Sequence, residues 1–132
     1  MTTISFDLVS PEQLLFNEEV GMIIVPGKDG DIGVLPGHSK VLSSLRPGRV
    51  MIYNEDKILL KSFFVTGGFV EINSEKCIVL AEEICEMNTL DKSAIEKDVL
   101  ELTDQDDDES KENLLIAKLK IEALSYSHYE KI

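Results

Sequence analysis

The stretch that decides the fold is VPGKDGDIGVLPGH, residues 25–38. It contains two Pro-Gly pairs, and the turn-forming residues 28–30 are followed by the short apolar run 32–35. Proline fixes φ and glycine accepts positive φ, so both favour tight turns. The glycines are unevenly spaced and no P-loop lysine follows them, which argues against a phosphate-binding loop. The stretch therefore predicts short strands separated by turns.

The same pattern extends outward from Ile4 to about Cys85. Turn signals recur at roughly the 8 to 12 residue spacing of antiparallel sandwiches and barrels. Residues 58–65 are apolar on both faces except at Lys61 and Ser62, which predicts a central strand covered on both sides. Other strands alternate with period two, and their inward residues are expected to be Ile4, Phe6 and Leu8; Val20, Met22 and Ile24; Val70 and Ile72; and Ile78 and Leu80.

After Met87 the apolar residues follow a helical period. Candidate N-caps are Thr89 or Asp91 for a first helix and Asp108 or Ser110 for a second. Neither helix is long enough to be stable alone in water, so each needs a covering surface. The expected apolar stripes are Leu90, Ala94, Ile95, Val99 and Leu102, and then Leu114, Ala117, Ile121 and Leu124, flanked by Leu115 and Leu119.

The predicted fold class is therefore α+β. An antiparallel β-sandwich is expected in residues 1–86, followed by an antiparallel two-helix hairpin in residues 87–132, with residues 103–109 joining the helices. A chain of 132 residues is long enough for one main core with a short appendage.

Composition narrows the classes of partner. The chain has 25 acidic and 13 basic residues, a net charge of −12, and its only arginines are Arg46 and Arg49. Nucleic acids and anionic lipids attract clustered basic residues, so direct binding to either is not expected. No run of apolar residues is long enough to span a membrane, and the first residues do not resemble a signal peptide. We expect an intracellular protein that reaches a membrane only through a protein partner.

No catalytic or metal site stands out. Residues 104–109 resemble the start of a calcium-binding loop, but Glu109 stands where that loop needs glycine, so a solvated acidic turn is expected. His38 and His128 lie in no metal-binding motif, and His38 is either an exposed or capping turn residue or a partner contact. Cys77 and Cys85 have no paired spacing and are expected to be buried thiols. No cofactor is expected.

The order of motifs resembles the epsilon family of F-type ATP synthase subunits, called delta in mitochondria. The most specific match is GDIGVLPGH at residues 30–38 followed by GGFVE at 67–71, supported by VSPE at 9–12, LRPG at 45–48 and VLAEE at 79–83. The resemblance spans nearly all of the first 86 residues, whereas the hairpin matches mainly in architecture. Two rival interpretations are an unrelated β-sandwich binding module and a small hydrolase or metal enzyme.

The resemblance implies a non-catalytic rotor subunit whose sandwich grips the gamma subunit and sits on the ring of c subunits. It implies that Asp31, with its neighbours Asp29 and Gly30, faces the ring, and that Ser10, His38 and Ser43 lie on or near the gamma-facing side. It also implies that the helices can reach the alpha and beta subunits. The expected location is the cytoplasmic face of a bacterial inner membrane, peripheral through the complex.

The hairpin departs from the family in two ways. Some members bind ATP through an I/L-D-x-x-R-A motif; here Leu90 and Asp91 are kept but Ala94 replaces the arginine, which removes a phosphate partner. Residues 87–132 also hold 12 acidic and 6 basic residues, a net charge of 6 − 12 = −6. The inhibitory arm of the family approaches an acidic segment of beta, so like charge should weaken that contact. We expect little or no ATP binding and modest or no inhibition of ATP hydrolysis.

Overall fold

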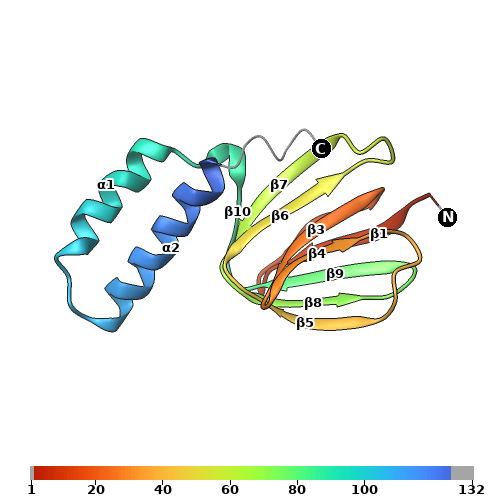
Figure 1. Cartoon of the computed structure of the whole chain (residues 1–132), viewed down its shortest axis with the longest axis horizontal. Helices are drawn as coiled ribbons and strands as arrows, with labels where there is room; N and C mark the ends of the chain where they lie inside the picture. Colours follow the sequence, from red (N-terminus) through yellow and green to blue (C-terminus); the bar gives the residue numbers. More distant parts are fainter. Residues whose placement is uncertain (1, 126–132) are drawn as a thin grey trace.

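The computed structural model describes residues 2–125 and contains a β-rich body followed by two helices (Figure 1). The 3₁₀ turn Met87–Thr89 joins the two parts. The helices are α1 (Lys92–Thr103) and α2 (Asp108–Ser125), and neither is long and apolar enough to cross a membrane. The strands are β1 (Ile4–Val9), β2 (Leu14–Val20), β3 (Met22–Gly27), β4 (Gly30–Val34), β5 (Val41–Leu45), β6 (Gly48–Tyr53), β7 (Leu59–Val65), β8 (Gly68–Ile72), β9 (Lys76–Ala81) and β10 (Ile84–Glu86).

The strands form one curled sheet in the order β10-β7-β6-β3-β5-β8-β9-β1-β2, with β4 paired to β3. All pairs are antiparallel except β1 with β9, which run parallel. The sheet closes on itself: Phe16 lies on β2, the last strand of the order, and Phe63 on β7, the second, yet their ring centroids lie 6.4 Å apart. The ring centroids of Phe6 on β1 and Phe16 lie 5.8 Å apart. The inward side chains of both layers thus form one core, as the predicted sandwich requires.

The alternation predicted for β1 and β8 is confirmed, because Ile4, Phe6 and Leu8 are buried, as are Val70 and Ile72. For two other strands the predicted inward face is wrong. In β9 the buried residues are Cys77, Val79 and Ala81, while Ile78 is half-buried and Leu80 is exposed. Both faces of β9 carry apolar residues, so alternation alone could not select the inner one.

The predicted alternation of Val20, Met22 and Ile24 is right for Val20, which is buried, and wrong for Met22 and Ile24, which are half-buried. Val20 ends β2, whereas in β3 Ile23 and Val25 are buried, followed by the buried Pro26 and Gly27. Gly21 separates the two strands. A Cβ there would lie 2.3 Å from the carbonyl oxygen of Asn54, so only glycine fits this close approach. The bend at Gly21 shifts the inward positions of β3 by one residue.

The prediction of a strand covered on both sides is confirmed for the second half of β7, which lies between β10 and β6. Phe63 and Val65 point into the main core, whereas Phe64 points the other way. Phe64 forms a second cluster with Met87 and Ala123. Residues around them are partly buried: Cys85, Leu90, Ile116, Leu119 and Leu124. The hairpin therefore covers the outer face of β7.

Carboxylates at both helix starts satisfy free backbone N–H groups. Asp91 caps α1, as predicted, and accepts from the Ser93 backbone N–H at 3.0 Å. At α2 the prediction of Asp108 or Ser110 is wrong. The Asp107 carboxylate accepts from the Ser110 backbone N–H at 3.0 Å and from the Ser110 hydroxyl at 2.8 Å. Both bonds lower the pKa of Asp107, and the bond from the Ser110 hydroxyl has the larger effect.

The two helices pack against each other, and α2 lies nearer the strands than α1 (Figure 1). In α1 the predicted stripe is right for Ile95, which is buried, but Ala94 is exposed. In α2 Ala117 is buried as predicted. The predicted stripe omitted Ala123, which is buried against the sandwich. The face of α2 that packs against β6 and β7 thus differs from the face that the helical period predicted.

Candidate partner-binding surfaces

The predicted ring-facing residues lie on the β3–β4 hairpin. Gly27 pairs with Gly30 and Pro26 pairs with Asp31, so Lys28 and Asp29 form the tip. Asp29, Gly30 and Asp31 are all exposed. A Cβ at Gly27 would lie 2.6 Å from the Gly30 carbonyl oxygen, so glycine permits the tight closure of this hairpin. The structure therefore presents these three residues on one projecting turn.

Arg46 contacts this turn, which sequence reasoning did not foresee. Its Nη2 lies 2.5 Å from Oδ1 of Asp31, and its Nη1 donates to the carbonyl oxygen of Gly27 at 2.6 Å. The Arg46 and Asp31 side chains remain 42% and 57% exposed. The only hint in the sequence was that Arg46 is one of two arginines in an acidic chain. Asp31 is thus an ion-paired carboxylate and not an isolated turn acid.

The three predicted gamma-side residues lie at separate places around the layer made of β5, β8, β9 and β1. The backbone N–H of Gly37, next to His38, donates to the Ser74 carbonyl at the β8–β9 turn. Ser10 follows β1 at the opposite end of that layer, and its hydroxyl donates to the Gln13 carbonyl at 3.3 Å. Ser43 lies mid-strand on β5, opposite Val70. The structure does not bring the three together in one cluster.

The outer face of the same layer carries an apolar patch that the sequence did not reveal. Phe69 pairs directly with Leu80, and Leu80 pairs with Val9. Phe69 and Leu80 are 55% and 49% exposed, and Leu42 on β5 is 74% exposed. We call Val9, Leu42, Phe69, Ile78 and Leu80 the outer patch. A shallow groove of about 240 Å³ beside Phe69 and Leu80 is also lined by Ser10, which therefore borders this patch.

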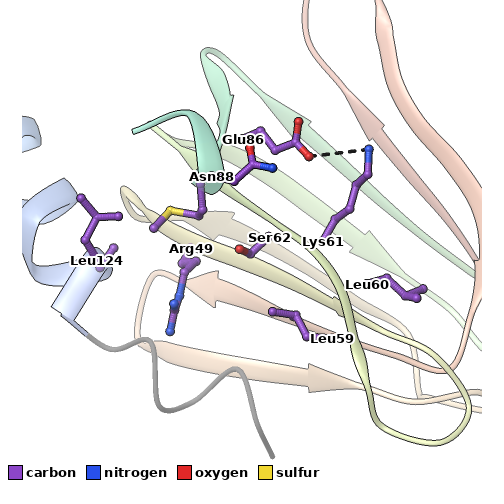
Figure 2. Close-up of a pocket in the computed structure, with 10 residues that line it drawn as sticks. Arg49, Leu59, Leu60, Lys61, Ser62, Glu86, Asn88 and Leu124 are labelled. Carbon is purple, nitrogen blue, oxygen red and sulfur yellow. Dashed lines mark ion pairs between the residues drawn. The ribbon is translucent and has the colours of Figure 1, made fainter. Parts of the chain in front are cut away.

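The seam between the hairpin and the sandwich contains a second groove, of about 430 Å³ (Figure 2). Leu124 of α2 stands on one side of it and Lys61 of β7 on the other. Nζ of Lys61 lies 3.6 Å from Oε1 of Glu86 across its rim. On α2, Nζ of Lys120 lies 5.8 Å from the ring centroid of Phe64, within range of a cation–π contact. These polar contacts surround a small apolar seam.

The residues at the nucleotide-motif positions have structural roles here. The Asp91 carboxylate is occupied as the N-cap of α1, and Leu90 packs against the second cluster. Ala94 is exposed and offers no charge to a phosphate. In residues 2–125 no three histidine, cysteine or acidic side chains come close enough to hold a metal ion.

The cysteines are embedded in apolar surroundings. Cys77 is fully buried, as predicted, and burial, with a smaller contribution from Asp7, raises its pKa to about 12. Cys85 is half-buried, and its pKa is also raised by burial. Both thiols therefore stay protonated near neutral pH and are poor nucleophiles.

Comparison with known proteins agrees with these features. Residues 3–87 match the family described as ATP synthase, Delta/Epsilon chain, beta-sandwich domain. The ATP synthase epsilon chain of Rhodospirillum rubrum is 46% identical over 93 residues, covering 70% of this chain and 69% of that protein. The epsilon chain of Maricaulis maris is 34% identical over 123 residues, covering 90% of this chain and 91% of that protein.

Solved structures support the same fold. A chain of the Euglena gracilis mitochondrial ATP synthase (OSCP/F1/c-ring) superposes with a TM-score of 0.81 at 22% identity, covering 97% of this chain and 82% of that chain. A chain of the Tetrahymena thermophila mitochondrial ATP synthase central stalk/c-ring superposes with a TM-score of 0.59 at 16% identity, covering 94% and 95%. The family match sets aside both rival interpretations of the sequence. The chain belongs to the delta/epsilon family of ATP synthase subunits and is an epsilon-type, non-catalytic subunit.

Proposed function

We propose that this chain is a central-stalk subunit that transmits torque between the c-ring and the catalytic head. Its sandwich, residues 1–86, binds the gamma subunit, and the complex holds the chain at the cytoplasmic face of a bacterial inner membrane. The observation that carries this proposal is the outer patch. Large apolar side chains exposed side by side on a sheet face are typical of a protein–protein interface.

The gamma subunit occupies the outer patch in this proposal. Ser10 borders the patch. Ser43 follows Leu42 on β5 but pairs with the buried Val70, so its side chain lies on the other face of the strand and does not join the patch. His38 extends the contact toward the β8–β9 turn. Asp29, Gly30 and Asp31 contact the polar loops of the c-ring from their own turn. A rigid sheet between the two surfaces suits a part that must carry force.

The hairpin, residues 87–132, is a regulatory arm in this proposal, and its effect on ATP hydrolysis is small. Its net charge of −6 opposes approach to the acidic segment of beta, and its described part is docked on the sandwich. ATPase rates of the complex should change little when the hairpin is deleted. Strong suppression that disappears on deletion would contradict this part of the proposal.

The hairpin also lacks the charge needed to hold a nucleotide strongly. Asp91 serves as a cap and Ala94 replaces the motif arginine. Calorimetric titration of the purified chain with ATP should give no binding at micromolar concentrations. Micromolar affinity for the unmodified chain would contradict the proposal.

The gamma contact is tested with a double variant of the outer patch, Phe69→Ser with Leu80→Ser. One apolar hot-spot residue typically contributes ~2 kcal/mol or more, and such losses do not simply add, so affinity for an alpha-beta-gamma head should fall at least about 30-fold. The matched control is Leu60→Ser on β7, which is 47% exposed but lies outside the outer patch. Equal affinity for the double variant and the control would contradict gamma binding at the patch.

A further inference from the structure

We propose that Arg46 is a positioning residue for the turn that faces the c-ring. By binding Asp31 and the Gly27 carbonyl together, it fixes the carboxylate in the orientation that meets the ring. The inference rests on the proposed function, because it takes the ring contact of Asp31 as given. It adds that the docking element is the Asp31–Arg46 pair and not Asp31 alone.

The guanidinium joins both strands of the hairpin. Nη2 lies 2.5 Å from Oδ1 of Asp31 on β4, and Nη1 lies 2.6 Å from the Gly27 carbonyl oxygen on β3. Two bonds from two nitrogens of one planar group fix the orientation of that group. A lysine ammonium has no such planar fork. Arg46 therefore ties the turn closed and holds the Asp31 side chain against it.

Arg46 is itself held by the backbone. Its N–H donates to the Pro26 carbonyl at 3.0 Å, and the Lys28 N–H donates to the Ser44 carbonyl at 2.9 Å. A Cβ at Gly48 would lie 2.8 Å from Cβ of Pro26, so the turn after Arg46 lies directly against β3. The β3–β4 hairpin and the β5–β6 turn are thus braced together, and the pair sits on rigid supports.

The exposure of the pair indicates how it acts. Both side chains stay near half-exposed, and such a surface ion pair contributes little to folding stability. Among the described residues, no donor other than Arg46 reaches the Asp31 carboxylate. Its second oxygen is available to one hydrogen-bond donor of a partner, such as a backbone amide or hydroxyl of a ring loop. Fixing the carboxylate before binding lowers the entropy cost of that contact.

The test compares docking onto two forms of the complex. Each full-length variant is titrated onto detergent-solubilised ATP synthase stripped of its own epsilon chain, and onto an alpha-beta-gamma head without the ring. The affinity for the complete complex, divided by the affinity for the head without the ring, measures the ring contact. The variants are Asp31→Asn, Arg46→Gln, Arg46→Lys and the double variant Asp31→Asn with Arg46→Gln. Melting temperature of each free chain reports folding.

We expect Arg46→Gln to lower the ratio about two- to fivefold, the range for an exposed charged pair, and Asp31→Asn to lower it similarly. The double variant should be no worse than either single variant, because both remove the same contact. Arg46→Lys should lie between Arg46→Gln and wild type. The affinity for the alpha-beta-gamma head and the melting temperature of the free chain should stay unchanged. If Arg46 had a purely structural role, its loss would lower both.

Other outcomes overturn the proposal in distinguishable ways. If Asp31→Asn lowers the ratio and Arg46→Gln does not, Arg46 has no positioning role, although the ring contact stands. If the two losses add in the double variant, Arg46 contacts the ring on its own. If neither variant changes the ratio while both bind the head normally, the ring contact itself fails, and with it that part of the proposed function.

Discussion

The sandwich and the hairpin differ in how firmly they are built. The main core contains many side chains with 0% or 1% exposure, drawn from both layers of a closed sheet. The second cluster contains three buried residues, Phe64, Met87 and Ala123, within a ring of half-buried ones. Regions with little buried apolar surface open at lower free energy than the core. The hairpin is thus expected to leave the sandwich without unfolding it.

The largest effect is expected from the core. Phe6→Ala removes a fully buried ring that contacts Phe16, and should cost ~3–5 kcal/mol of unfolding free energy. Urea denaturation measures this loss. The control is Phe69→Ala in the outer patch, where removal of an exposed ring should change stability by less than ~0.5 kcal/mol. Equal costs at both positions would contradict the assignment of inner and outer faces.

A smaller effect is expected at the seam. Ala123→Asp places a charge against Phe64 and Met87, and should shift the docked hairpin toward the undocked form by ~1–3 kcal/mol. Hydrogen exchange should then speed up in α1 and α2 and stay slow in β1 and β9. Lys118→Asp, on an exposed position of α2, is the control. Loss of protection throughout the sheet would mean that the two regions unfold as one unit.

The smallest effect is expected from pH. Asp107 has a lowered pKa in the folded state, so its contribution is fully present above the unfolded pKa of about 3.9 and is lost as pH falls through the lower folded value. Acidification from pH 5 to pH 2 should therefore release the first turn of α2. NMR chemical shifts of the Ser110 amide report the change, and Asp107→Asn should remove it. An amide that titrates identically in this variant would refute the capping assignment.

The sequence predicted those features that depend on neighbouring residues. The faces of β1 followed from alternation because its outward residues, Ser5 and Asp7, are polar. The face of β9 did not, because Ile78 and Leu80 point outward into the outer patch. The alternation of polar and apolar residues tends to fail where an exposed strand face is apolar because it binds a partner. That failure marks the candidate gamma site.

Other features depend on contacts that alternation and capping rules do not describe. Asp31 and Arg46 are 15 residues apart, and only the pairing of β3 with β5 brings them together. The N-cap of α2 was predicted wrongly because residues 106–108 are all aspartate, and the sequence does not show which one precedes the first helical turn. The buried line of α2 likewise depends on where Phe64 emerges from β7.

The measurement that tests the account most directly is co-elution with an alpha-beta-gamma head in size-exclusion chromatography. The full chain is compared with a version ending at Glu86 and with the Phe69→Ser, Leu80→Ser double variant. The account predicts that the full chain and the shortened version co-elute with the head and that the patch variant does not. Co-elution of the patch variant together with loss of the shortened version would contradict it, because the hairpin and not the sandwich would then bind gamma.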